Sequence, residues 1–168
     1  MSVSVYAMTI ELFVPMLANL SKILEKSVLY AQDKKIEAGV LENLRLAPNM
    51  FALTRQVQFS CDFAKLSTAR LAGIEAPSFP DTEKTLSELQ ERISKTIEWL
   101  KTITPAQLAD APMRHITVPL RNRTLELEGL AFLQKWVLPN FYFHVTTTYA
   151  LLRSVGIEVG KQDYLGGV

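Results

Sequence analysis

Four segments of this chain repeat apolar residues at intervals of three and four positions, and this spacing limits most strongly what the chain can fold into. Residues spaced in this way lie along one side of an α-helix, whereas a half-buried strand would show strict alternation. The first three stripes are Ile10, Val14, Leu17, Leu20, Leu24, Val28 and Ala31; Leu53, Val57, Cys61, Ala64 and Leu71; and Leu86, Leu89, Ile93, Ile97 and Leu100. The fourth stripe begins after Gly129 with Leu130, Leu133, Trp136 and Val137. The pattern predicts four helices that bury their apolar faces against one another.

Between the third and fourth stripes the period changes from helical to alternating. The alternating apolar residues are Ile116, Val118, Leu120, Leu125 and Leu127. The polar triplet at 121–123 separates the two runs and can form a turn, so we expect a β-hairpin over residues 116–128. The sequence therefore predicts an all-α fold: a four-helix bundle with a small β-hairpin between the third and fourth helices. At this length we expect a single domain, residues 1–168.

Local signals also predict where the helices begin and which residues face solvent. Asn49 is a plausible N-cap for the second helix, and we expect the third helix to begin at Asp81 or Thr82. Arg92 lies off the apolar stripe of the third helix, so we expect it on a solvated surface. The glycine-containing tail, residues 157–168, is expected to be irregular.

Charge balance and the cysteine count exclude several classes of protein. Eighteen basic and 17 acidic residues give a net charge of +1, which is not the electrostatic footprint of a nucleic-acid-binding protein. The single cysteine, Cys61, excludes an internal disulfide and a cysteine-based zinc ribbon. The N-terminal segment has no basic leader and includes Glu11 in its apolar run, and no later run reaches about 18 apolar residues. We expect a cytoplasmic protein with no nucleic-acid and no membrane partner.

Polar side chains interrupt the apolar face of the fourth helix. Asn140, His144, Thr147 and Thr148 are spaced so that they share one face, and buried polar groups must find hydrogen-bonding partners. One interpretation is structural: the threonines donate to carbonyl groups one turn earlier, and His144 bonds to a neighbouring helix. The other interpretation is functional: the polar strip faces a pocket inside the bundle, where such folds build their sites.

The stretch HVTTTYALLRSVG, which starts at His144, resembles the fourth helix of the DinB/YfiT-like superfamily. More narrowly, LPNFYFHVTTTYALLRSVGIEVGKQDYLG and RLAPNMFALTRQVQFSCDFAKLSTARLAG resemble a bacterial branch of that superfamily that is known as a domain of unknown function. The resemblance covers essentially the whole chain. It implies a DinB-like four-helix bundle in a superfamily that includes many metalloenzymes.

The resemblance also implies where a site would lie. The usual site of the superfamily holds a divalent ion with three histidines, one early in the second helix and an H-x-x-x-H pair on the fourth. In this chain the pair falls on Asn140 and His144, and the position in the second helix falls on Gln56. Carboxamides are weak ligands for zinc and nickel, so the resemblance implies a degenerate metal site. We predict a polar pocket of Gln56, Asn140, His144 and Thr148 and expect no cofactor; a divalent zinc or nickel ion is the alternative.

Few other residues could replace the missing ligands. Cys61 lies on the apolar stripe of the second helix, which favours an inert buried thiol. Asp62 lies about 100° away from that stripe, where solvent or a basic partner would satisfy its charge. His115 precedes the hairpin and would reach the pocket only if that segment folded over it. No residue is identified as catalytic.

Three functions remain open at this stage. The first is a small-molecule-binding or non-catalytic bundle with a degenerate metal site. The second is a metal-dependent hydrolase or thiol transferase, as the wider superfamily implies. The third is an interaction module, because Trp136, Phe141, Tyr142 and Phe143 supply more aromatic surface than one helix face can bury. That surplus favours a homodimer.

Overall fold

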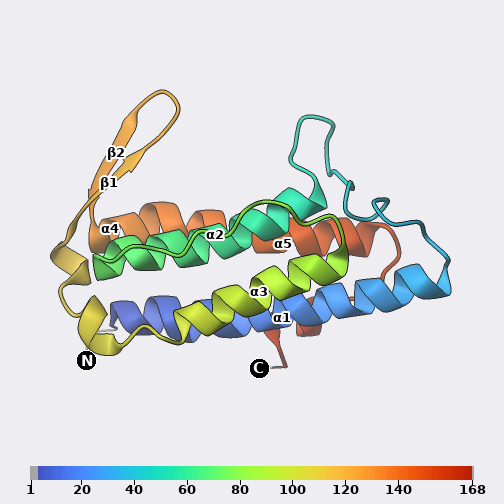
Figure 1. Cartoon of the computed structure of the whole chain (residues 1–168), viewed down its shortest axis with the longest axis horizontal. Helices are drawn as coiled ribbons and strands as arrows, with labels where there is room; N and C mark the ends of the chain where they lie inside the picture. Colours follow the sequence, from blue (N-terminus) through green and yellow to red (C-terminus); the bar gives the residue numbers. More distant parts are fainter. Residues whose placement is uncertain (1–3, 168) are drawn as a thin grey trace.

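The computed structural model describes residues 4–167 and is mainly helical (Figure 1). The long helices are α1 (Val5–Asp33), α2 (Leu53–Ala72), α3 (Leu86–Leu100) and a fourth made of α4 (Gly129–Phe132), the π-helical turn η3 (Leu133–Val137) and α5 (Leu138–Ser154). The short elements are the 3₁₀ turns η1 (Pro105–Leu108) and η2 (Ala111–Met113), the strands β1 (His115–Pro119) and β2 (Thr124–Glu128), and α6 (Lys161–Leu165). The predicted four-helix bundle with a hairpin before its fourth helix is confirmed.

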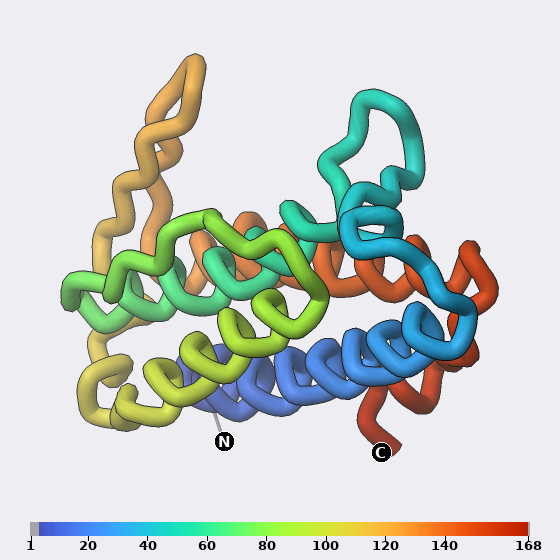
Figure 2. Tube along the Cα trace, turned by 45° about the vertical axis from the view of Figure 1, so that its right-hand side comes forward, coloured from blue at the N-terminus to red at the C-terminus, as the bar shows by residue number. Residues whose placement is uncertain are grey.

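The bundle has two layers, with α2 beside α5 in one and α1 beside α3 in the other (Figures 1 and 2). The core lies between them, where Phe13 of α1 meets Phe141 of α5 with ring centroids 4.6 Å apart. By length and composition alone α1 could also cross a membrane, since its most apolar window has a mean hydropathy of 1.4. In this fold its stripe residues Leu17, Leu20 and Leu24 are fully buried in the core instead.

The hairpin pairs β1 and β2 antiparallel, with Ile116 opposite Leu127. It rises from one end of the α2/α5 layer, and the segment 34–52 rises on the same side at the other end (Figures 1 and 2). Gly129 follows the hairpin where the chain passes very close to η2: a Cβ atom at this position would lie 1.9 Å from the carbonyl oxygen of Ala111. A residue with a side chain would therefore push the hairpin and the fourth helix away from η2.

The second helix begins three residues later than predicted, at Leu53 rather than after a cap at Asn49. The amide groups of Leu53 and Thr54 donate to the carbonyl oxygens of Leu44 (2.9 Å) and Glu42 (3.1 Å). The preceding loop thus supplies acceptors that a capping side chain would otherwise supply.

The third helix also begins later than predicted, and Asp81 and Thr82 lie in the connector before it. Thr85 is the N-cap of α3: its hydroxyl accepts from the Glu88 amide (3.2 Å), and the Glu88 carboxylate accepts from the Thr85 amide (3.0 Å). This reciprocal capping box fixes the first turn of α3, which begins at Leu86.

The fourth helix runs on through its internal proline, because Val137 and Leu138 before it keep right-handed helical backbone angles. The π-helical turn η3 precedes Pro139, and the Leu138 amide donates to the carbonyl of Leu133, five residues earlier. The prediction of an irregular tail is wrong, because α6 forms within residues 157–168. The Asp163 carboxylate accepts from the Gly160 amide (2.8 Å), which stabilises the first turn of α6.

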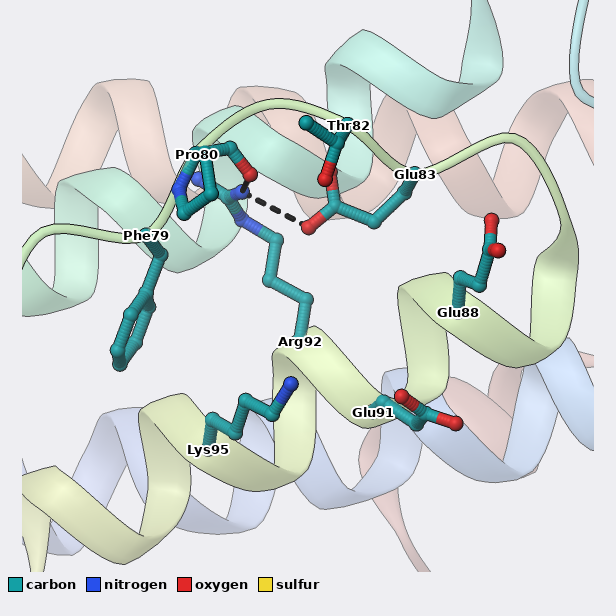
Figure 3. A pocket seen from close by; sticks show the side chains of 8 residues that line it. All are labelled: Phe79, Pro80, Thr82, Glu83, Glu88, Glu91, Arg92 and Lys95. Carbon is teal, nitrogen blue, oxygen red and sulfur yellow. Dashed lines mark hydrogen bonds and ion pairs between the residues drawn. The ribbon is translucent and has the colours of Figure 1, made fainter.

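Arg92 lies in the interior, so the prediction that it faces solvent is wrong. Its side chain is 1% exposed, and its guanidinium nitrogens contact carboxylate oxygens of Asp62 (3.0 Å), Asp81 (3.0 Å) and Glu83 (2.9 Å). Figure 3 shows the arginine and Glu83 at a pocket of about 260 Å³ beside α3. Because Asp81 and Glu83 belong to the connector 74–85, Arg92 holds that connector against α2 and α3.

Candidate functional site

His144 lies on the face of α5 that packs against α2, and its position there is set by one hydrogen bond. The His144 Nδ1 atom lies 2.7 Å from Gln56 Oε1. The Gln56 amide nitrogen donates to the Phe51 carbonyl oxygen (3.0 Å), and a carbonyl oxygen can only accept, so the Gln56 oxygen must be the acceptor toward His144. His144 therefore carries its proton on Nδ1. Its Nε2 atom has a free lone pair, and no hydrogen bond to it is formed within residues 4–167.

Three phenylalanine rings enclose the imidazole of His144. Phe59 and Phe63 of α2 stack with it at centroid distances of 4.9 Å and 5.5 Å. Phe143 meets it edge-on at 5.3 Å, and Phe51 lies against Phe59 at 5.1 Å. The histidine is only 8% exposed, so its polar edge sits in a largely apolar surrounding.

This environment controls the charge of His144. Burial lowers its pKa from 6.5 to about 4, and the positive charge of Arg55 acts in the same direction. Arg55 lies over the Phe59 ring, 4.3 Å from its centroid, and is held there by an ion pair with Asp81. At neutral pH the imidazole is uncharged and offers an acceptor through Nε2.

The site opens to the surface as a cleft of about 420 Å³ between α2, α5 and the loop before α2. Gln56, Asn140 and His144 come together in its lining, and Asn49 lies on its rim. Thr148 does not line it: this residue is fully buried, and its hydroxyl donates to the His144 carbonyl (2.9 Å). The Thr147 hydroxyl likewise donates one turn back (2.7 Å), so the structural interpretation of the threonines is confirmed. A functional role for the polar group stays a prediction.

The side chains present do not fit the three-histidine centre of the superfamily. The Gln56 oxygen is already engaged by His144, and His115 lies on β1, outside the cleft lining. Cys61 is fully buried, and burial raises the pKa of its thiol to about 12. Asp62 is engaged in ion pairs. Across residues 4–167, no group of three or more histidine, cysteine, aspartate or glutamate side chains is arranged to hold a metal ion.

The aromatic walls of the cleft are what sequence reasoning missed. Phe59 and Phe63 follow Gln56 at three and seven positions, so all three share one face of α2. That spacing was available as a signal, since it places two large rings beside the predicted polar position. Phe51 reaches the cleft through the path of the loop before α2, and Arg55 is held beside it by Asp81 of the connector. No local sequence pattern reveals either contact.

The four-helix bundle with a hairpin before its fourth helix is a DinB-like fold. The crystal structure of a DinB family member protein from Shewanella denitrificans matches it with a TM-score of 0.91 and 42% sequence identity, over 98% of this chain and 93% of that chain. Residues 5–165 match the model of the domain of unknown function DUF1993, and the chain belongs to that family. Comparison with curated proteins finds no significant match.

Proposed function

We propose that this chain is a small-molecule-binding domain whose cleft at His144 takes a flat, uncharged molecule carrying an N–H or O–H donor. The cleft does not hold a transition metal in the manner of the superfamily, because two of the three ligand positions are carboxamides that bind such ions weakly. One observation carries the proposal: the Nε2 atom of His144, which the helices leave unpaired in the cleft, is a hydrogen-bond acceptor.

Two hydrogen-bond acceptors in the cleft lining are available to a ligand. His144 offers Nε2, because its other ring nitrogen is committed to Gln56. Asn140 offers its side-chain oxygen, and its amide nitrogen uses one of its two N–H groups to donate to the Trp136 carbonyl (2.7 Å). An anionic oxygen would bring a further acceptor to these two, whereas an O–H or N–H group would satisfy either. Asn49 on the rim is exposed and can present either end of its amide.

The walls favour a flat molecule without charge. Phe51 and Phe143 are each 54% exposed at the cleft, so their rings are available for stacking. The described lining residues include no side chain that is charged at neutral pH, and transfer of a charge into such a surrounding is costly without a partner. A phenol-like or amide-bearing ring system has the required shape, neutrality and donor.

Phenol and benzoate provide a matched pair for the test, since they share a ring and differ in donor and charge. In a titration followed by NMR, we expect phenol to shift the resonances of the cleft and benzoate to leave them unchanged. His144→Leu removes the acceptor and should weaken phenol binding about tenfold, the magnitude of one hydrogen bond. Thr147→Val, one turn away and outside the cleft lining, is the control and should bind phenol normally. Equal binding of benzoate, or unchanged phenol affinity in His144→Leu, would refute the proposal.

The absence of a bound transition metal is tested separately. Elemental analysis of protein purified without an affinity tag should find no stoichiometric zinc or nickel. A stoichiometric metal that disappears in His144→Ala would instead favour the metal-dependent hydrolase or thiol transferase, whose activity would be abolished by a chelator.

A further inference from the structure

A second cavity of about 200 Å³ adjoins the His144 cleft and has no role so far. It lies where α2, the hairpin and the start of the fourth helix meet, and seven of its ten lining residues are aromatic or aliphatic. Phe59 and Phe63 line both this groove and the cleft. The two cavities are therefore neighbours that share two walls.

We infer that the cleft and the groove form one elongated site for an uncharged amphiphile, with a flat donor-bearing head at His144 and an unbranched apolar tail along the groove. This inference rests on the proposed function, because it places the head in the same cleft. The tail would pass Phe63 and Trp136, whose ring centroids are 6.4 Å apart, and reach Leu120 at the turn of the hairpin. A polar or charged tail would find few partners along this path.

The polar residues of the groove do not argue against an apolar tail. The Asp62 carboxylate is occupied by Arg92 (3.0 Å) and Lys65 (3.6 Å). Arg70 lies fourteen residues beyond Gln56 on α2, which places it at the end of the groove remote from His144. Between Phe63 and Arg70 the groove is lined by Leu66, which is 36% exposed.

The length of α2 sets the length of the tail. Phe59 and Leu66 are seven residues apart, which corresponds to about 10 Å along the helix axis. An extended chain advances about 1.2 Å per bond, so a tail of about eight carbons would span this distance. Each methylene that enters the groove should raise affinity about fourfold, and carbons beyond the groove should add little.

A series of 4-alkylphenols from phenol to 4-decylphenol tests the inference with a constant head. We expect affinity, measured by calorimetry on the full chain, to rise about fourfold per carbon and to level off near eight carbons. Leu66→Asp places a charge in the groove and should abolish the rise while leaving phenol affinity unchanged. Leu130→Asp is the matched control, because Leu130 has the same 36% exposure and lines neither cavity; it should keep the full rise.

The outcomes separate this inference from the proposed function. If phenol binds at His144 but the alkyl series shows no rise, the elongated site is refuted and the cleft stands. If no member of the series responds to His144→Leu, the cleft itself is refuted, and the elongated site with it. If Leu66→Asp halves the molar mass in light scattering without changing the alkyl series, a second copy of the chain covers the groove and the inference is overturned.

Discussion

Acidification should destabilise this protein through His144 in a pH range above that of most carboxylates. The imidazole is buried among Phe59, Phe63 and Phe143, beside the positive charge of Arg55. Protonation in the folded state would place a second N–H in this surrounding without an acceptor. The unfolded chain pays no such penalty, so it takes up the proton at a higher pH than the folded chain does.

The size of the effect follows from the two pKa values. The pKa of His144 is about 4 in the folded protein against 6.5 for the free side chain. The stabilisation is fully present above pH 6.5 and is lost as the pH falls toward 4, because the unfolded state binds more protons over that interval. Between pH 7.5 and pH 5.0 the free energy of unfolding should fall by about 2 kcal/mol from this residue alone.

Urea denaturation at both pH values, followed by circular dichroism, measures the loss. His144→Gln is the control, because it keeps a neutral hydrogen-bonding group and removes the titration; its stability should fall by about 2 kcal/mol less than that of the wild type. Carboxylates act in a lower range: hydrogen bonds from Arg92 and Gln58 outweigh burial and lower the pKa of Glu83 below 4.5. An identical pH dependence in the two proteins would show that His144 is not held neutral by the fold.

Three further outcomes are expected. Arg92→Met should lower the free energy of unfolding, measured by urea denaturation, by about 2–3 kcal/mol. This loss is smaller than for a fully buried ion pair, because the carboxylate partners of Arg92 are partly exposed. Lys95→Met, on the exposed side of α3, is the control and should change the free energy of unfolding by under about 0.5 kcal/mol. Gly129→Ala should lower the free energy of unfolding by about 1–3 kcal/mol, because its Cβ would overlap the Ala111 carbonyl; Gly160→Ala, with the nearest atom 4.0 Å away, should cost far less. Light scattering at micromolar concentration should give the mass of a homodimer, and a monomeric mass would contradict that prediction.

The parts of the fold that could be predicted from sequence are those determined by local periodicity. The four helical stripes and the alternating run before Gly129 each carry their own signal, since burial of one face requires that spacing wherever the segment packs. The first residue of each helix is harder to predict, because either a capping side chain or a distant carbonyl group can accept from the first amide groups of a helix. Loop carbonyls serve α2, and a capping box at Thr85 serves α3, although Asn49 and Asp81 are equally good caps by residue type.

Arg92 shows why the interior charges were not predictable. On α3 it has the spacing of a surface residue, and the carboxylates that neutralise it come from α2 and from the connector 74–85. The desolvation cost of a buried arginine is offset only when several carboxylates surround it, and the tertiary fold determines whether they do. The spacing of Arg92 on α3 therefore predicts a solvent-exposed side chain, and only the carboxylates of α2 and the connector make its burial possible.

The candidate site divides along the same line. The resemblance aligned Gln56, Asn140 and His144, and helical geometry alone explains why residues at 140 and 144 share a face. Their chemistry depends on contacts between distant segments: the Phe51 carbonyl orients the Gln56 amide, which in turn determines that His144 presents a lone pair at Nε2. A purely structural histidine needs one partner, and this one has it through Nδ1. Packing does not require the unpaired Nε2 atom beside the stacked rings. This atom is the one through which a bound molecule would be recognised.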